Sequence, residues 1–263
     1  MVTIGWSDAA ARAGVTIREL SEIDEFQQVN RLFDDIWHPE PRNVPVPLEL
    51  MIGFAHAGGY VAGAYEGDTL VGASVGFLAA DRTLHSHVTG TVAGRGIGYA
   101  LKLHQRDWCR KRGLRRITWT FDPLVRRNAR FNLVKLGARP EEYLEDFYGT
   151  MADAINEGDA SDRLLAVWPV DQDRRAAAAD APAVDEPPRA LLACEDGRPV
   201  FHLAGGEVVL VGTPPDVEEL RRTDPGTAAE WRAAVRTALG GLMGAGGEVI
   251  GFTNQGEYEV WVH

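Results

Sequence analysis

The chain has 263 residues, which exceeds a typical single domain and predicts one domain of ordinary size with a smaller second one. Hydrophobic residues make up 45% of it and charged residues 25%, as in globular proteins with a packed core. The 38 acidic residues outnumber the 27 basic ones, and the net charge of −11 argues against broad attraction to nucleic acid or to an anionic membrane surface.

The cysteine pattern and the N-terminal segment narrow the class of protein. Cys109 and Cys194 are far apart and have neither a CxxC partner nor a nearby histidine, so we expect no metal and no disulfide framework. The first residues, MVTIGWSDAAARAG, lack an apolar signal core, and no apolar run approaches the roughly 18 to 20 residues that span a bilayer. We therefore expect a cytoplasmic protein without membrane contact.

The first predicted elements alternate between strands and helices. A short strand leads to an amphipathic helix with Ser21 as its N-cap. A proline-rich connector follows, and a short helix then ends at Gly58. Two β-rich runs around the turn EGDT predict an antiparallel hairpin, and a further strand continues it. We expect these elements at residues 15–20, 21–37, 48–58, 60–79 and 83–92.

The middle of the chain continues this alternation. A helix is marked by Ile97, Ala100, Leu101 and Trp108, and a strand with Trp119 on one face follows it. Another helix then ends at Gly137, and two more strands complete the region. We expect these elements at 97–113, 115–121, 126–137, 143–150 and 163–170.

The composition changes after residue 170. Residues 171–189 are rich in Ala, Asp and Pro and lack apolar periodicity, which is typical of a linker. We therefore predict a domain at 1–170 and a small α+β module at 190–263. In the module we expect short strands, a helix with Thr213 as N-cap and Asp216 at the capping-box position, a second helix around Trp231, and a closing hairpin.

A glycine turn between a strand and a helix, VAGRGIG, is the strongest chemical signal. The first amides of a helix have no partner within it, and together with the helix dipole they favour an anion. Gly94, Gly96 and Gly98 let the backbone approach a phosphate closely. The spacing is shorter than a dinucleotide fingerprint, so a turn without any ligand stays an alternative at this point.

The same stretch resembles the GNAT acyltransferase superfamily. The resemblance covers about residues 15–168 and is carried by HVTGTVAGRGIGYALKLHQRDWCRKRGLRRITWTFDP and RNARFNLVKLGA. The segments AHAGGYVAGAY, LVGASVGF and TWTFDPL are similar to those of a bacterial branch of predicted acyltransferases with an extra C-terminal module. The resemblance implies an α/β (α+β) fold with a GNAT-like mixed, mostly antiparallel sheet flanked by helices, plus a smaller C-terminal α+β module.

The resemblance also implies a cofactor site. In the family pattern the backbone of Val92 pairs with the pantetheine arm, Asn128 faces that arm, and the pyrophosphate loop follows the fourth strand. The expected binding residues are Val92, Gly94, Arg95, Gly96, Ile97, Gly98 and Asn128. Two positions depart from the pattern: Ala93 replaces the usual Arg or Gln, and Leu133 replaces the tyrosine that often acts as general acid.

Three residues are candidates for acyl transfer itself. His85 and His87 are expected to share a strand face with Thr89 and Thr91, where His87 acts as general base. Asp122 orients a histidine or binds the amine. The alternatives are structural: histidines that only hydrogen-bond within the sheet, and an aspartate that begins a loop before Pro123.

Several other residues have two interpretations. Arg126, Arg127 and Arg130 either meet a CoA phosphate or an acidic acyl group, or form a solvated face. Arg42 is a candidate for binding a substrate carboxylate. The tryptophans are expected in the core or at its rim rather than in a substrate cage, namely Trp37, Trp119 and Trp168.

The leading interpretation is an N-acyltransferase. It uses acyl-CoA as co-substrate, with acetyl-CoA or succinyl-CoA expected, or a thioester on an acyl carrier protein. The acceptor is a small-molecule amine that attacks directly, and a homodimer is a further expectation. The alternatives are a non-catalytic acyl-thioester-binding or scaffold protein with a degenerate GNAT fold, and a nucleotide-binding regulator.

Overall fold

The computed structural model describes residues 5–38, 44–92, 94–149, 160–171 and 186–262. The chain divides into two compact units, which are Met1–Trp119 with Pro169–Asp173 and Thr120–Trp168 with Arg174–His263. Residues 120–168 thus group with the C-terminal half. Most of the predicted linker at 171–189 lies outside the described residues, so a domain boundary there stays a prediction.

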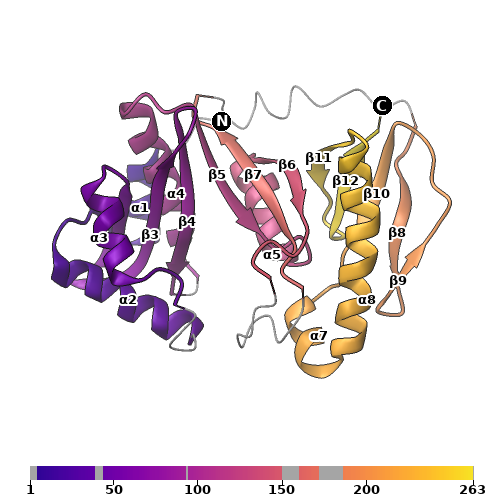
Figure 1. Cartoon of the computed structure of the whole chain (residues 1–263), viewed down its shortest axis with the longest axis horizontal. Helices are drawn as coiled ribbons and strands as arrows, with labels where there is room; N and C mark the ends of the chain where they lie inside the picture. Colours follow the sequence, from indigo (N-terminus) through magenta and orange to yellow (C-terminus); the bar gives the residue numbers. More distant parts are fainter. Residues whose placement is uncertain (1–4, 39–43, 93, 150–159, 172–185, 263) are drawn as a thin grey trace. The chain divides into compact units, whose positions relative to one another are not determined.

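The first unit contains a sheet with helices on both faces, drawn from indigo to magenta in Figure 1. Helices α1 and α4 pack together, and α4 covers one face of β3 and β4, while α2 and α3 pack on the opposite face. The bounds are α1 Trp6–Ala13, β1 Thr16–Glu19, α2 Ile23–Trp37, α3 Leu48–His56, β2 Tyr60–Glu66, β3 Thr69–Ala79, β4 Thr83–Thr91, α4 Ile97–Lys111 and β5 Arg116–Phe121.

The strand order is β1-β2-β3-β4-β5-β7-β6 in the seven-stranded sheet that the described residues form. Strands β1 to β4 pair antiparallel in succession, β4 pairs parallel with β5, and β6 pairs antiparallel with β7. The prediction of a mixed, mostly antiparallel sheet flanked by helices is therefore confirmed.

The core of the first unit confirms most of the predicted apolar face of α2, although Ile23 at its start is exposed. Phe26, Val29 and Phe33 of this helix are buried against Met51 of α3 and Val75 of β3. At about 25 cal/mol per Å² of buried apolar surface, such packing is the main contribution to the stability of the sheet. The hairpin at 60–79 and the strand at 83–92 are also confirmed as β2, β3 and β4.

Two helix starts in the first unit differ from the predictions. The N-cap of α2 is Glu22 rather than Ser21, because the carboxylates of Glu22 and Glu25 form a capping box around the first turn. Helix α1 is not among the predicted elements. It is short, its buried residues are the alanines Ala9, Ala10 and Ala13, and it ends at Gly14 in the left-handed conformation (φ 70°), so its buried face lacks the large apolar residues that make a helix easy to predict.

The second unit contains the β6–β7 hairpin, a helical segment before it and a second sheet. Its bounds are α5 Arg126–Ala129, the π-helix η1 Arg130–Leu136, β6 Arg139–Leu144, β7 Arg163–Pro169, β8 Arg189–Glu195, β9 Arg198–Phe201, β10 Val208–Gly212, α7 Val217–Thr223, α8 Pro225–Val235, the π-helix η2 Arg236–Gly240, α9 Gly241–Gly244, β11 Glu248–Phe252 and β12 Glu257–Trp261.

The second sheet has the order β11-β12-β10-β8-β9 in the described residues and is drawn in orange and yellow in Figure 1. Strands β8 and β10 pair parallel, and the other neighbours pair antiparallel. The predicted closing hairpin is confirmed as β11 and β12. Trp231 of helix α8 is fully buried, as its spacing predicts.

Two predictions for the second unit are wrong in register. Asp216, not Thr213, is the N-cap of α7, and its carboxylate accepts the Glu219 amide at 2.9 Å. The two prolines after Thr213 favour extended backbone there, which delays the helix. The strand expected at 143–150 is β6, which begins at Arg139 and ends at Leu144. No helix within the described residues is long and apolar enough to cross a membrane.

Candidate functional site

Strand β4 carries a β-bulge in the middle of the sheet. Val75 of β3 pairs with Val88, whereas the next residue, Gly76, pairs with Ser86, so His87 is the extra residue. A bulge changes the direction of the side chains on either side of it. Simple alternation along residues 85–91 is therefore interrupted at His87.

The bulge corrects the prediction that four polar residues share one face. Thr89 faces α4, because its hydroxyl lies 2.8 Å from that of Ser74, which in turn accepts from Gln105 of α4. The rings of His85 and His87 instead lie near Phe77, on the opposite face. His85 and His87 are thus brought together, but away from Thr89 and Thr91.

The pairing between β4 and β5 ends beside this bulge. The two parallel strands are paired from Thr83 with Arg116 to His85 with Thr118. In the described part of the chain, no pair joins residues 86–91 of β4 to β5. The backbone of β4 therefore has an open side after His85, where an extended group can bind as a strand would.

The histidine face combines two rings with different surroundings. His85 is half-buried, and its Nδ1 lies 3.1 Å from the hydroxyl of Thr118. Burial, together with the nearby charges of His87 and Lys102, lowers the pKa of His85 to about 4. His85 is therefore neutral at physiological pH and a weak base, which favours its structural interpretation.

His87 is exposed and has a defined tautomer. Its Nε2 lies 3.0 Å from the carbonyl oxygen of Pro45, and a carbonyl only accepts, so Nε2 carries the proton. The lone pair of the neutral ring is then on Nδ1, for which the described residues contain no hydrogen-bond partner. Of the two histidines, His87 is the one with a free basic atom.

The α4 face of β4 contains a buried polar cluster that the sequence analysis missed. Lys102 donates to the hydroxyl of Ser86 at 2.8 Å, lies 3.5 Å from the side-chain oxygen of Gln105, and sits 4.0 Å from the centre of the Trp119 ring. A signal was present, because Gly98, Lys102, Gln105 and Cys109 form one stripe at helical spacing. That stripe indicates a buried polar side of the helix.

Lys102 is a buried cation without a carboxylate. Lys102 is only 6% exposed, and in the described part of the chain no Asp or Glu pairs with it. Burial lowers the pKa of Lys102 to about 7, although the nearby Cys109 has a small raising effect. The group therefore exchanges its proton near neutral pH.

The glycine turn has the backbone geometry that an anion site needs. Gly94, Arg95 and Gly96 all have positive φ (93°, 57° and 81°), and Gly96 caps α4 without a side-chain hydrogen bond. Within 4 Å of the Cβ positions of Gly94 and Gly96 there is open space. Arg95 forms a two-point ion pair with Glu66 at 2.7 and 2.9 Å. Ala93 lies outside the described residues.

The backbone of Val92 points in a different direction from the one predicted. Its amide donates to the carbonyl of Val71 in β3 at 2.9 Å, so it is directed toward β3. Because successive residues of a strand direct their amides to opposite sides, the open side of β4 belongs to Thr91. Because the described residues include no partner on that side, Thr91, rather than Val92, has the backbone groups that can pair with a ligand.

Asp122 belongs to a buried ion-pair network in the second unit. Arg232 contacts both carboxylate oxygens at 2.9 Å, and Arg221 and the Leu124 amide add bonds of 2.6 and 2.9 Å. Burial raises the pKa of Asp122, but the two guanidinium groups outweigh it and hold that pKa well below its usual range. These bonds occupy the carboxylate, so the loop-forming interpretation describes it better than pairing with a histidine.

The residues of α5 contact the C-terminal part of the second unit. Arg126 donates to Thr213, Arg127 pairs with Glu218 at 2.6 Å, and Arg130 donates to Asn254 at 2.6 Å. Arg127 and Arg130 are nevertheless exposed, which agrees with the interpretation of a solvated face, whereas Arg126 is half-buried. Asn128 is exposed, and its backbone amide donates to Val125 at 3.0 Å. Arg42 lies outside the described residues.

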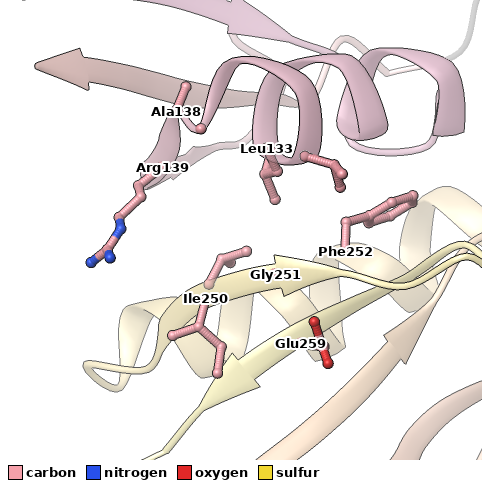
Figure 2. Close-up of a pocket in the computed structure, with 10 residues that line it drawn as sticks. Leu133, Ala138, Arg139, Ile250, Gly251, Phe252 and Glu259 are labelled. Atoms are coloured by element: carbon pink, nitrogen blue, oxygen red, sulfur yellow. The ribbon is translucent and has the colours of Figure 1, made fainter. Parts of the chain in front are cut away.

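Leu133 lines a pocket of about 250 Å³ in the second unit. Figure 2 shows Leu133 on η1 and Phe252 on β11 pointing toward one another, with Glu259 on the neighbouring strand. The pocket is mostly apolar, and burial raises the pKa of Glu259. The hydroxyl group that a tyrosine would supply at position 133 is thus replaced by a packing side chain. Of the tryptophans, Trp119 and Trp168 are buried and Trp37 packs against the core, as predicted.

Comparison with known proteins gives similarity at the level of structure. No protein-family model matches the chain, and no curated protein matches it. Among solved structures, it is similar to a Desulfovibrio desulfuricans protein described as an acetyltransferase of the GNAT family, with 20% identity and a TM-score of 0.49 over 59% of this chain and 99% of that one.

Two further structures show the same level of similarity. One is the ribosomal-protein-S18-alanine N-acetyltransferase from Escherichia coli, with 14% identity and a TM-score of 0.48 over 60% of this chain and 95% of that one. The other is a Salmonella typhimurium protein described as an acetyltransferase and solved with acetyl-CoA, with 16% identity, a TM-score of 0.48 and the same coverage. Because these TM-scores are below 0.5, we base the function on this chain's own residues.

Proposed function

We propose that this protein is a GNAT-type N-acyltransferase that moves an acyl group from acyl-CoA, or from a carrier-protein pantetheine thioester, to the amine of a small molecule. One observation carries the proposal: strands β4 and β5 stop pairing at His85 and Thr118, and the freed edge of β4 leads directly into a glycine turn and the start of α4. An edge for an extended arm and an anion site for its phosphate are thus consecutive in the chain.

The start of α4 is where the phosphate end of the donor binds. Gly94 and Gly96 have open space around them, and the first-turn amides of a 15-residue helix favour a negative group. Arg95 is held by Glu66, so it contributes little net positive charge. A site that has helix amides but little net positive charge fits either the diphosphate of CoA or the single phosphate of a carrier-bound pantetheine.

The open edge of β4 is where the pantetheine arm binds. The amide groups of the pantetheine arm pair with the backbone of Thr91, as an additional strand would. The thioester then lies toward the bulge, next to His85 and Ser86. Backbone amides where the strands part are suited to stabilise the oxyanion that forms during acyl transfer.

The amine attacks from the histidine face of β4. Most amines are protonated at neutral pH, so a base or a water must take a proton before or during the attack. His87 is exposed, and its Nδ1 carries the lone pair, which makes it the base in this proposal. Neither cysteine belongs to this region, since Cys109 is buried and Cys194 is in the second unit, so direct attack is favoured over a covalent acyl-enzyme.

The test is thiol release from a panel of donors. The protein is incubated with acetyl-, succinyl- and malonyl-CoA and with an acyl carrier protein, each with an amine library, and free thiol is followed. We expect release that depends on both a donor and an amine. Donor binding without release across the panel would favour the scaffold alternative, and ATP or NAD that displaces CoA would favour the nucleotide-binding regulator.

The role of His87 has its own test. His87→Ala is expected to lower kcat by about 10²-fold, while His85→Ala, which removes a weaker base, is expected to have a smaller effect. Unchanged turnover of His87→Ala at saturating substrates would remove His87 as the base.

A cytoplasmic location and a homodimer stay predictions.

A further inference from the structure

We propose that Lys102, acting through the hydroxyl group of Ser86, supplies the proton that the departing thiolate takes up during acyl transfer. This inference rests on the proposed acyltransferase function and names a group that completes it. An amine that displaces a thiolate leaves a strong nucleophile beside the new amide, and protonation of the sulfur makes the step irreversible in practice.

The position of Ser86 favours this role. Ser86 directly follows His85, the last residue of β4 that pairs with β5, and it is the residue before the bulged His87. A thioester along the open edge of β4 therefore ends beside Ser86. The side chain of Ser86 faces α4, where its oxygen accepts from Lys102 at 2.8 Å.

Lys102 bridges the two strands where they part. Its Nζ contacts Ser86 of β4 on one side and the Trp119 ring of β5 on the other, at 2.8 Å and 4.0 Å to the ring centre. Both partners tolerate a cation, but neither neutralises it. The ammonium group is thus held at the point where the strand pairing ends.

The direction of the hydrogen bond fits proton delivery. An ammonium group has no lone pair, so it donates and Ser86 accepts. The hydroxyl proton of Ser86 is then free to be donated to another acceptor. The second contact of Lys102, to Gln105 at 3.5 Å, is long, and Gln105 itself donates to Ser74 at 3.3 Å, which orients its oxygen toward Lys102.

The groups around Lys102 leave its proton available near neutral pH. On α4 the facing titratable group is Cys109, whose thiol pKa burial raises to about 12, so it is neutral. On β4 the titratable group that interacts electrostatically with Lys102 is His85, which lies on the other face of the strand and is neutral at pH 7. On β5 the facing group is the Trp119 ring. With burial as the main cause, the pKa of Lys102 is about 7, so the ammonium group releases its proton readily.

The step balances as follows. The amine nitrogen forms a bond to the thioester carbonyl carbon, and the carbon–sulfur bond breaks with its electron pair on sulfur. The sulfur takes the hydroxyl proton of Ser86, and the Ser86 oxygen takes a proton from Nζ of Lys102, which becomes neutral. The amine gives its own proton to the base on the other face, and Lys102 regains a proton from water. The net products are an amide and a free thiol.

The test compares two leaving groups in three variants. Lys102→Met removes the cation while filling its space, Ser86→Ala removes the hydroxyl, and Lys111→Met, on the exposed end of the same helix, is the matched control. Each is assayed with acetyl-CoA and with the acetyl thioester of thionitrobenzoate, whose acidic thiol leaves without needing a proton. Lys102 acts through Ser86, so we call it a positioning residue.

With acetyl-CoA, we expect kcat of Lys102→Met to fall by about 10²-fold, in the range of general acid catalysis. With the activated thioester we expect a change of less than about threefold, because no proton is needed. The fall in kcat that the unaltered protein shows as pH rises through the pKa of Lys102 is expected to disappear in the variant. Ser86→Ala shows the same pattern, and Lys111→Met behaves as the unaltered protein.

The outcomes separate the two proposals. If the unaltered protein transfers acyl groups but Lys102→Met loses kcat equally with both thioesters and keeps its pH profile, the proton relay is wrong and the acyltransferase proposal stands. If the unaltered protein releases no thiol from any donor, both proposals are wrong. Circular dichroism checks that each variant folds, and Ser86→Ala decides the matter if Lys102→Met does not.

Discussion

Two buried charges, Lys102 in the first unit and Asp122 in the second, differ in what surrounds them. Both residues are nearly inaccessible, at 6% and 8% exposure. Asp122 is neutralised by Arg221 and Arg232, whereas Lys102 contacts a hydroxyl, an amide oxygen and an aromatic ring. A compensated charge is typical of a scaffold, and an uncompensated one costs stability and is available for chemistry.

The two pKa values express this difference. The arginines hold the pKa of Asp122 well below its usual range, so Asp122 stays ionised over the whole physiological range. Burial lowers the pKa of Lys102 to about 7, so Lys102 titrates within that range. Lys102 in the first unit thus changes its protonation state within the physiological pH range, whereas Asp122 in the second unit stays charged throughout it.

The largest effect is expected from breaking the compensated cluster. Asp122→Asn leaves two arginines buried without a carboxylate, and we expect a loss of about 3–5 kcal/mol in the free energy of unfolding. Urea unfolding measures it. Glu218→Gln, which removes an exposed partner of Arg127, is the control and should cost less than about 1 kcal/mol.

The same variant gives a pH dependence with a definite sign. Because the folded pKa of Asp122 is lowered, its contribution to stability is fully present above the unfolded pKa of about 4. It is lost as the pH falls below that value. The stability difference between the unaltered protein and Asp122→Asn should therefore stay constant from pH 7 to pH 5 and shrink in stronger acid; a difference that already shrinks at pH 6 would mean that Asp122 is not held by the arginines.

A stabilising effect is expected from removing the uncompensated charge. Lys102→Met should raise the free energy of unfolding at pH 6 by on the order of 2–4 kcal/mol, because the buried cation is no longer desolvated. The folded pKa of Lys102 lies below the unfolded one, so the cost of burial is complete below pH 7 and fades as the pH rises toward 10. Unfolding measured at pH 6, 8 and 9.5 should show a shrinking gain. A destabilised variant at pH 6 would contradict the idea of an uncompensated charge.

A smaller effect is expected at the phosphate end. Gly96 has φ 81°, a conformation in which a β-branched residue is strained, so Gly96→Val should weaken CoA binding about tenfold or more. Gly98→Ala is the matched control, because Gly98 has no positive φ and its added methyl group would meet only Thr91 at 3.9 Å. Calorimetry with CoA measures both. Equal affinities in the two variants would move the phosphate site away from the start of α4.

The smallest effect concerns the histidine next to Lys102. The charge of Lys102 contributes to lowering the pKa of His85, so Lys102→Met should raise the pKa of His85 from its value of about 4. Titration of the imidazole carbon signals by NMR from pH 3 to 8 detects the change. His202, a histidine of the second unit whose partner is Glu195, is the internal reference; movement of both signals by the same amount would indicate a general effect.

Local patterns in the sequence predict much of the fold. The features that they do not predict depend on contacts between residues that are far apart in the chain. Alternation and the EGDT turn suffice for β2 and β3, and the apolar spacing suffices for α4. The bulge at His87 depends on how β4 meets β3, so HSHVTGT contains no sign of it. The partners of Asp122 lie 99 and 110 residues further along the chain, beyond any local pattern. The burial of Lys102 similarly depends on Ser86 and Trp119, which lie on other elements.

The central claim is that the open edge of β4 and the start of α4 hold an acyl thioester. A crystal structure of the intact chain with coenzyme A tests it most directly. We expect the pantetheine amides to pair with the backbone of Thr91, the phosphate groups to contact the amides at residues 96–98, and the sulfur to lie beside Ser86. Coenzyme A bound elsewhere, with side chains filling the space between β4 and β5, would contradict the claim.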